Sequence, residues 1–425
     1  MTDRRTFLKQ AGLFTASLPL LSAVERAAAA VPAATGDKWN DLRALFDLDP
    51  NYLHFSNFLL ASHPRPVRDA IVRLRERFDE NPGEVMDWHR EEVWKHENAV
   101  RDQVGRYFGV KPGQVALIGS TTEGLATVYG GVQVRPDQEI LTTVHEHYSA
   151  YTTLELRQRR AGTQVRNITL FKDPQTISRD EVLGNIARAI RPETRVLGMT
   201  WVQSGSGVKL PAGEIGELVH EANRNRDEAD RIIYVVDGVH GFGVEDATFA
   251  DLDCDFFIAG THKWMFGPRG TGIIVARSEQ PKGIIPTVPT FTQGENFGTL
   301  FTPGGYHAFE HRLALGEAFK LHLQLGKADV QARIHQLNGY LKQRLLEHPK
   351  VRLVTPASPE FSAGFTFFRV QGRDCDSVAA HLMKHRVIAD AVARDVGAVV
   401  RLAPSLLNNE AEIDQVMTIL APQLS

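Results

Sequence analysis

The fold is decided by two stretches, Val235-Val236-Asp237-Gly238-Val239-His240 and Phe256-Phe257-Ile258-Ala259-Gly260-Thr261-His262-Lys263-Trp264. Each is an apolar run of strand length that ends abruptly in ionisable residues. Strands of a parallel sheet are covered on both faces and read as continuous apolar runs, and ligands bind beyond their carboxyl ends. These stretches therefore predict that Asp237 and Lys263 meet at one edge of a parallel sheet.

The same alternation of strands and helices continues on both sides of these stretches. Helical patterns such as 178–190 and 212–225 separate further strands, which are expected at 115–118, 139–144, 164–168, 195–202, 231–236, 255–259 and 272–276. Strands that alternate with helices indicate a mostly parallel, doubly wound α/β sheet.

Beyond residue 303 the pattern changes to long helices with a few strands. Helices are expected at 309–326 and 328–347, and strands at 351–354, 364–370 and 399–402. This predicts a smaller α+β domain at the C-terminus. The chain is accordingly divided into a signal peptide (1–30), an N-terminal segment (31–65), a large domain (66–309) and a small domain (310–425).

Composition limits the classes of protein that fit. The chain has 425 residues, of which 43% are hydrophobic and 23% charged, and its formal net charge is −3. These values are typical of a soluble globular protein and give no support for nucleic-acid binding. Two cysteines, Cys254 and Cys375, exclude a disulfide framework and are expected to be unpaired core thiols.

The first thirty residues have the features of an export signal. Arg4 and Arg5 precede Phe7-Leu8-Lys9, an apolar stretch follows at 11–23, and four alanines stand at 27–30. This order is typical of a twin-arginine signal, and the apolar stretch is too short to span a bilayer. We expect export through the twin-arginine translocase to the periplasm, without a stable membrane anchor.

An acid and a lysine at neighbouring strand ends indicate a particular cofactor. Pyridoxal 5'-phosphate (PLP) needs a lysine for its Schiff base and a carboxylate that keeps the pyridine nitrogen protonated. Lys263 and Asp237 fit these two roles, and His240 is placed to donate toward the 3-oxygen of the ring. Read singly, Asp237 also suits a helix cap or a metal ligand, and His240 a structural histidine.

Two further segments fit the same cofactor. Gly119-Ser120-Thr121-Thr122-Glu123-Gly124 follows a strand and opens a helix, where backbone amides and hydroxyls bind anions. His147 follows the strand at 139–144 and could stack on a planar ring. The alternative is a zinc site, for which the candidate ligands are His145, Glu146, His147, His240 and His262, although their spacing fits no compact zinc motif.

These residues resemble the class V aminotransferase family of fold type I PLP enzymes. The resemblance rests on 237–240 with 262–264, on 121–123, on Glu146-His147 and on 200–204, and it extends from about residue 50 to the C-terminus. The family includes cysteine desulfurases and isopenicillin N epimerase-like proteins. The resemblance implies a large PLP-binding domain with a smaller C-terminal domain, and a homodimer.

The resemblance also implies roles for single residues. Lys263 becomes the Schiff-base lysine, Asp237 the partner of the ring nitrogen and His147 the stacking ring. Thr122 and His262 would hold the phosphate with the backbone of Thr121, and Thr302 of a neighbouring subunit would assist. Gln203 or Ser204 would contact the 3-oxygen, and Arg401 would bind the substrate carboxylate.

The export signal and the segment 301–312 look similar to exported members of the family that mature the siderophore pyoverdine. That resemblance implies action on a glutamate of the siderophore precursor, which would become a succinic-type side chain. Within PLP chemistry the alternatives are an epimerase, another aminotransferase and a C–S lyase. From other classes, a zinc hydrolase and a non-catalytic binding protein remain.

Overall fold

The computed structural model describes residues 36–85, 92–291 and 294–424, so the predicted signal peptide lies outside the described residues. The chain forms two compact units, one up to Ala44 and one from Leu45 onward. The first unit contributes α2 (Lys38–Arg43), which the side chain of Asp37 caps. All elements described below belong to the second unit.

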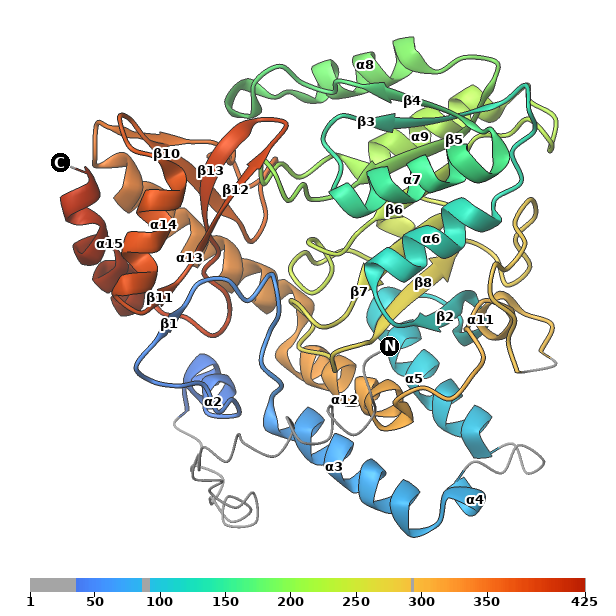
Figure 1. The fold of residues 1–425 in the computed structure, drawn as a ribbon, viewed down its shortest axis with the longest axis horizontal. Coiled ribbons are helices and arrows are strands. Elements are labelled where there is room, and N and C mark those ends of the chain that lie inside the picture. Colours follow the sequence, from blue (N-terminus) through green and yellow to red (C-terminus); the bar gives the residue numbers. More distant parts are fainter. Residues whose placement is uncertain (1–35, 86–91, 292–293, 425) are drawn as a thin grey trace, which may run out of the picture. The chain divides into compact units, whose positions relative to one another are not determined.

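A seven-stranded sheet forms the centre of this unit (Figure 1). Its strand order is β2-β8-β7-β6-β5-β3-β4, and only β8 runs against its neighbours. The strands are β2 (Val115–Ile118), β3 (Glu139–Thr143), β4 (Gln164–Ile168), β5 (Thr194–Thr200), β6 (Ile233–Asp237), β7 (Phe256–Gly260) and β8 (Gly272–Ala276). The predicted doubly wound, mostly parallel sheet is confirmed.

Helices cover both faces of the sheet, which explains why its strands are apolar on both sides. α6 (Thr121–Gly131) and α7 (Tyr148–Ala161) lie across one face, and α9 (Ala212–Asn223) lies on the other (Figure 1). Alternate strand residues such as Ile118 and Val235 form a buried core under α6 and α7. Shorter elements complete this part: α8 (Arg179–Ala189), α10 (Phe249–Leu252), α11 (Phe297–Leu300), and the 3-10 turns Pro112–Gln114 and Pro174–Thr176.

A group of helices adjoins the edge of the sheet that ends in β2. α3 (Arg65–Glu80) is followed by α4 (Pro82–Val85) and α5 (Glu92–Phe108), and α12 (Phe309–Leu325) packs against both α3 and α5. Phe108 and Phe319 are fully buried in this region. The chain thus returns at α12 to helices that precede the sheet in sequence.

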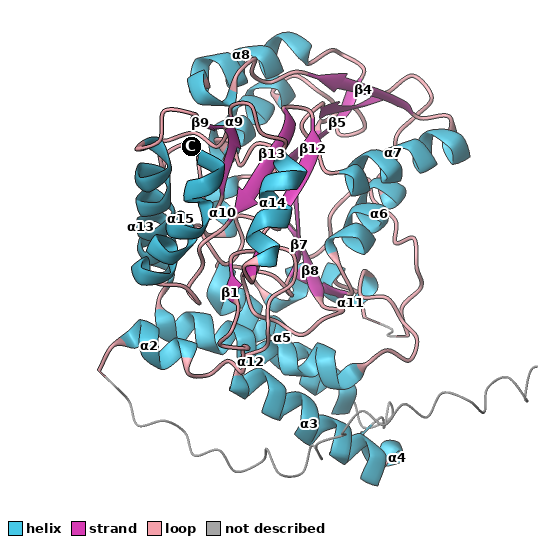
Figure 2. Ribbon diagram, turned by 60° about the vertical axis from the view of Figure 1, so that its left-hand side comes forward, coloured by secondary structure: helices cyan, strands magenta, loops and turns pink. Residues whose placement is uncertain are grey.

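The C-terminal part is the smaller α+β region that the sequence predicts (Figure 2). Its antiparallel sheet has the order β12-β13-β10-β9 and shares a separate apolar core with three helices. The elements are α13 (Lys327–Leu346), β9 (Val351–Leu353), β10 (Thr366–Val370), α14 (Cys375–Lys384), β11 (Val387–Ile388), β12 (Asp390–Arg394), β13 (Gly397–Leu402) and α15 (Glu410–Leu424). The domain boundary near residue 310 stays a prediction.

Two elements of this region were not expected from the sequence. β11 pairs in parallel with β1 (Leu53–His54), so the N-terminal segment joins the small region. β12 forms a hairpin with β13, in which Arg394 lies opposite Gly397. The two-residue connection Asp395-Val396 was not recognised as a turn, and this hairpin becomes important for the site.

Two smaller sequence predictions have a structural counterpart. Cys254 and Cys375 are both free and buried, as expected for core thiols. Among the described residues, no helix combines the length and apolarity needed to cross a bilayer.

Candidate active site

The loops that carry the predicted site residues leave the sheet at one edge. Thr121 follows β2, His147 follows β3, Gln203 follows β5, Asp237 ends β6, and Lys263 follows β7. Apart from β8 these strands run in the same direction, so their carboxyl ends meet. The chain therefore gathers residues that are up to 142 positions apart, from Thr121 to Lys263, at one place.

Lys263 lies on a tight turn directly after β7. The N–H of Gly267 donates to the carbonyl of Thr261 at 2.8 Å, and the N–H of Phe266 donates to the carbonyl of Lys263 at 3.1 Å. Phe266 has a φ of 56° and is 1% exposed, so burial of its ring compensates a left-handed backbone. The lysine is therefore presented by a rigid turn.

His240 fixes the amine of Lys263 from the neighbouring strand end. Its Nε2 lies 3.3 Å from Lys263 Nζ, and the indole N–H of Trp264 donates to its Nδ1 at 3.4 Å. Burial lowers the pKa of His240 well below its usual range, with Lys263 adding to the effect. Since Nδ1 is an acceptor, the neutral ring carries its proton on Nε2, which faces the site.

Burial shifts the pKa values of the acid and the lysine toward each other. Burial raises the pKa of Asp237 to about 6, against a hydrogen bond from the N–H of Val239 and the charge of Lys263. Burial likewise lowers the pKa of Lys263 to about 8, although Asp237 opposes this shift and Arg401 and Arg394 add to it. A substantial fraction of Lys263 is thus a free amine near neutral pH, as a nucleophilic lysine requires.

His147 is held as a neutral ring at the start of α7. It is the N-cap of this helix, and its Nδ1 accepts from the N–H of Ser149 at 3.2 Å. Burial lowers its pKa to about 4, and the positive charges of Arg394, Lys263 and Arg401 contribute. A neutral imidazole fixed by its own helix suits the predicted role of covering a planar cofactor.

An anion site forms where α6 begins. Thr121 Oγ1 accepts from the N–H of Gly260 at 2.8 Å, which leaves its own hydroxyl hydrogen available. A Cβ at Gly260 would lie 2.9 Å from His262 Cε1 and 3.0 Å from Thr121 Oγ1. The absence of a side chain at Gly260 therefore keeps a space open between the two, with Thr122 exposed beside it on the first turn of the helix.

Two buried donors point into this region without a protein partner. Neither Gln203 Nε2 nor His262 Nδ1 has a hydrogen-bond partner among the described residues. The amide of Gln203 is oriented by the hydroxyl of Ser206, which donates to Oε1 at 2.9 Å. Since buried polar atoms are normally paired, these two are available to bond a polar ligand. The backbone carbonyl of Ser204 accepts from Arg401, and the choice between Gln203 and Ser204 as the contact of the 3-oxygen stays a prediction.

Arg401 is buried on β13 and reaches the site from the small region. Its Nε and Nη2 both donate to Asp390, the residue opposite it on β12, and its Nη1 donates to the carbonyl of Ser204 at 3.1 Å. The guanidinium lies over the rings of Phe58 and Phe367. Of its five N–H groups, one on each Nη remains for a carboxylate.

Thr302 is bonded within its own subunit. Its hydroxyl donates to the carbonyl of Gly298 at 2.6 Å and accepts from the N–H of Leu117 and from Arg101. The side chain is 4% exposed. These bonds give the hydroxyl a structural role beside β2 within its own subunit, and its contact with the phosphate of a neighbouring subunit stays a prediction.

The residues considered as zinc ligands have separate partners. His145 Nδ1 lies 2.5 Å from Asp395 Oδ2, and its Nε2 accepts from the N–H of Leu170. The carboxylate of Glu146 accepts from the hydroxyls of Thr143 and Thr200. No group of three or more metal-ligating side chains is found within the part of the chain that the structure describes.

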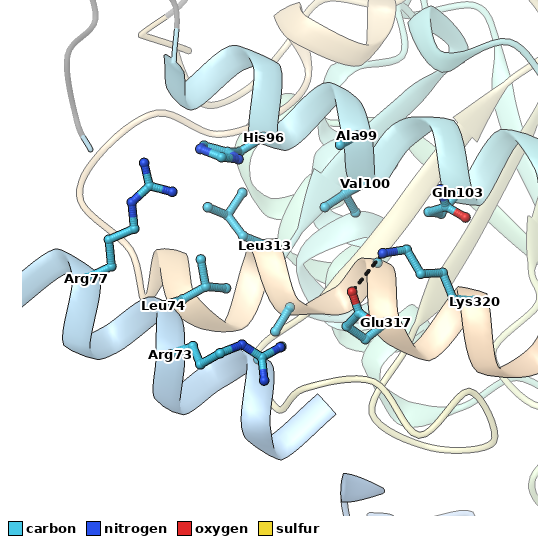
Figure 3. Close-up of a pocket in the computed structure, with 13 residues that line it drawn as sticks. Arg73, Leu74, Arg77, His96, Ala99, Val100, Gln103, Leu313, Glu317 and Lys320 are labelled. Atoms are coloured by element: carbon cyan, nitrogen blue, oxygen red, sulfur yellow. Dashed lines mark hydrogen bonds and ion pairs between the residues drawn. The ribbon is translucent and has the colours of Figure 1, made fainter. Parts of the chain in front are cut away.

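A separate cavity of about 390 Å³ lies among α3, α5 and α12 (Figure 3). Basic side chains such as Arg73, Arg77 and Lys320 surround an apolar floor that includes Leu74 and Leu313. None of the predicted site residues lines it. A larger cavity, of about 680 Å³, lies beyond the ends of β3 and β4, where His145 and Asp395 line it.

Taken together, the fold and the strand-end residues define a PLP-dependent enzyme of fold type I. The sequence profile described as aminotransferase class-V matches residues 61–416, and the chain belongs to that family. It is 27% identical over 402 residues to an isopenicillin N epimerase of Streptomyces clavuligerus, covering 90% of this chain and 97% of that protein. It is 25% identical over 346 residues to a probable cysteine desulfurase of Synechocystis sp., covering 77% and 78%.

Solved structures share the fold. A variant of C-DES with glycine linked covalently to the PLP cofactor aligns with a TM-score of 0.79 and 21% identity, covering 89% of this chain and 98% of that one. The cystine C–S lyase C-DES in complex with cysteine persulfide aligns with a TM-score of 0.76 and 22% identity, covering 88% and 98%. Membership of a PLP family leaves the zinc hydrolase and the binding protein without support.

The residues present fit PLP by the chemistry of their donors. Asp237 would hold the ring nitrogen, and Lys263 would bind the aldehyde carbon. The unpaired Nδ1 of His262 and the open cradle at Gly260 suit the phosphate, together with Thr121 and Thr122. The unpaired Nε2 of Gln203 and the proton-bearing Nε2 of His240 suit the 3-oxygen.

Sequence reasoning missed two residues of the site and gave a third no role toward PLP. Asp390 orients Arg401, Arg394 lies near Lys263 and His147, and Glu146 is buried behind Asp237. Asp390 and Arg394 precede a two-residue turn, and Gly397 follows it. Recognition of this turn as a hairpin would have placed Asp390 and Arg394 on the strand beside Arg401. Glu146 was noted in the sequence only as a zinc candidate and as part of the family resemblance, and the strand pattern did not predict its burial near Asp237.

Glu146 generates a prediction about stability and pH. Burial raises its pKa to about 7, despite the hydroxyls of Thr143 and Thr200. The folded protein thus keeps a proton that the unfolded chain loses near its ordinary pKa, so stability falls as pH rises between these values. A shift of this size corresponds to about 3 kcal/mol. Glu146→Gln should remove this loss.

The measurement is urea unfolding of the apo-protein at pH 5 and pH 8. We expect Glu146→Gln to match the wild type at pH 5 and to exceed its free energy of unfolding by about 1–3 kcal/mol at pH 8. Glu193→Gln, at an exposed position, is the matched control and should show no pH-dependent difference. An equal difference at both pH values would contradict the buried proton.

Proposed function

We propose that this PLP-dependent enzyme acts in the periplasm on a pyoverdine precursor. It would modify the free α-amino acid end of a glutamate side chain and yield a succinic-type side chain, with the α-carboxylate leaving as CO2, the amine leaving as ammonia, and dioxygen acting as the four-electron oxidant that turns Cα into the new carboxyl group. The observation that carries the chemistry is the convergence of Lys263, Asp237 and Arg401 around two unpaired buried donors. The substrate and the compartment are supported by the sequence alone, through the export signal and the segment 301–312.

Each side chain has a task that its environment supports. Bound PLP supplies an electron sink for negative charge at the substrate Cα. Lys263 Nζ, with its pKa near 8, can take up and return a proton at that carbon. Asp237 holds a proton on the ring nitrogen, and His147 covers one face of the ring and excludes water.

Arg401 orients the substrate. Its two remaining N–H groups can donate to an α-carboxylate, while Asp390 keeps the guanidinium from rotating. PLP assists cleavage of the bond that stands perpendicular to its ring. A carboxylate fixed by Arg401 therefore favours breaking the Cα–H bond first, which is also the bond that an epimerase breaks.

The relatives named as cysteine desulfurases suggest a second function, which the thiols of this chain do not favour. Cys375 is 7% exposed and packs in the apolar core of the small region with α14 and β13. Burial raises its pKa, and burial raises the pKa of Cys254 as well. Neither thiol is placed to receive sulfur. Epimerisation is favoured as the alternative, since the epimerase match spans 90% of the chain.

We further propose a homodimer. Between β8 and α12 the chain exposes large apolar side chains, namely Ile285, Val288, Phe291 and Tyr306. Phe291 and Tyr306 also pair with ring centroids 6.1 Å apart. Because exposed apolar clusters mark interaction surfaces, a second copy is their expected partner. Light scattering should give twice the mass of one chain, and Tyr306→Asp should shift it toward the monomer.

The cofactor assignment predicts how the apo-protein takes up PLP. The rate of uptake should rise with pH and level off above about 8, because only the neutral amine of Lys263 attacks the aldehyde. Absorbance of the bound cofactor follows the reaction, and borohydride should make it irreversible. Lys263→Ala should abolish this, while Lys350→Ala, at an exposed position, should not. A rate that keeps rising to pH 10 would contradict the shifted amine.

The substrate assignment is tested in a producing strain from which the gene is deleted. We expect mass spectrometry of the secreted pyoverdines to show unmodified glutamate side chains in place of the succinic type. The full-length gene should restore the succinic type, and a gene lacking residues 1–30 should not. Unchanged side chains in the deletion strain would refute the substrate, and rescue by the shortened gene would refute the compartment.

A further inference from the structure

Arg394 is a positive charge near the site that forms no ion pair within the described part of the chain, although Asp395 and Asp390 attract it from a distance. Among the described residues, no carboxylate lies within 4.0 Å of its guanidinium, and its buried Nε has no hydrogen-bond partner. Arg401, the other arginine of the site, forms an ion pair with Asp390. A half-buried guanidinium without an acid is costly, so its retention calls for a ligand.

Contacts from three sides place Arg394 at the entrance to the site. A Cβ added to Gly205 would lie 3.0 Å from Arg394 Cβ, so the arginine adjoins the loop that carries Gln203 and Ser204. Its guanidinium lies 5.5 Å from the ring centroid of Tyr148, the residue after His147. Its charge also acts on both His147 and Lys263, lowering the pKa of each.

Tyr148 makes this an open position. The tyrosine is 63% exposed, and its ring centroid lies 4.0 Å from that of His147. The exposed Tyr148 ring and the Arg394 guanidinium over it together provide a contact surface for a group that enters from solvent. Arg394 therefore faces whatever extends outward from a substrate held at Lys263 and Arg401.

The hairpin that carries Arg394 is fixed to the large sheet by its neighbour. Asp395 accepts from His145 Nδ1 at 2.5 Å, and the tautomer is set because His145 Nε2 accepts from the N–H of Leu170 at 3.1 Å. The His145 ring also stacks on Phe171 with centroids 4.1 Å apart. Asp395 thus bonds to His145 and forms no ion pair with Arg394, although its charge still attracts the guanidinium.

We infer that Arg394 binds a second anionic group of the substrate, distal to the α-carboxylate that Arg401 binds. The substrate class is an α-amino acid whose side chain carries, beyond its own γ-carbonyl, an acidic group. Asp395 and His145 act as positioning residues for this contact. The inference rests on the proposed action on a free α-amino acid end, and it adds the chemistry of the attached group.

The test compares two small probes that differ only in a distal charge. γ-Glutamylglycine and γ-glutamylglycinamide share the free α-amine, the α-carboxylate and the γ-amide. Binding to the holoenzyme is read from the change in cofactor absorbance on mixing. We expect the wild type to bind the acid about 10-fold more tightly than the amide, as for a hydrogen bond to a charged group, and the ratio to fall with added salt.

Substitutions then assign the preference to one side chain. Arg394→Gln should bind the two probes equally, with the affinity of the wild type for the amide. Arg394→Lys should keep part of the preference. The control is Arg352→Gln on β9, at the opposite edge of the small sheet, and it should keep the full ratio.

Each outcome separates the inference from the proposed function. If neither probe changes the cofactor absorbance of the wild type, the proposed action on γ-glutamyl amino acids is wrong. If both bind the wild type equally, the second anionic subsite is wrong even though the proposed function stands. A preference that Arg394→Gln retains also overturns it. Should that variant fail to fold, the ratio in the wild type and in Arg394→Lys decides.

Discussion

Desolvation of two opposite charges, Asp237 and Lys263, is the constraint on which this site depends. Both lie at strand ends within a protein interior, and their mutual attraction does not compensate the loss of water. The direction of the shifts shows this, because the pKa of Asp237 rises and that of Lys263 falls despite the attraction. Burial thus outweighs pairing, as is usual for buried ion pairs.

Stability must therefore come from elsewhere in the fold. Two separate apolar cores supply it, one under α6 and α7 and one in the small region. The polar side chains of the strand-end loops therefore need not stabilise the fold by pairing with one another. They can instead be arranged to bind a ligand. The left-handed Phe266, with φ of 56°, belongs to this arrangement, because a backbone strain of about 1–3 kcal/mol persists only where packing enforces it.

The parts of the site that the sequence predicted are those that strand order alone determines. A buried strand must end somewhere, and a parallel sheet brings its ends together, so Asp237, His147 and Lys263 could be placed without coordinates. The expected strands of the large sheet were found for the same reason. The untested assignments of individual roles stay predictions, although the unpaired Nε2 of Gln203 gives one of them a physical reason.

What the sequence did not predict depends on contacts between distant segments. Thr302 has the residue type of a phosphate ligand, but the partners of its hydroxyl, Leu117 and Gly298, are set by how α11 packs on β2. Arg401 was expected as a carboxylate ligand, yet its orientation by Asp390 required the unrecognised strand β12. Local patterns identify elements, whereas pairings between elements decide which polar groups remain available.

The two regions contribute different groups to the site, which explains how one fold can support different reactions. Residues at the ends of the large sheet provide for the cofactor, whereas the β12–β13 hairpin supplies Arg394 and Arg401 from the small region. Relatives named as an isopenicillin N epimerase and as a probable cysteine desulfurase are 27% and 25% identical to this chain, so family membership alone does not select a substrate. In this chain Asp390 leaves Arg401 two N–H groups, and Asp395 is withdrawn from Arg394 by His145. We therefore propose that the acids of the hairpin determine the choice of substrate. Their bonds within the protein decide which N–H groups of Arg394 and Arg401 remain available to a substrate.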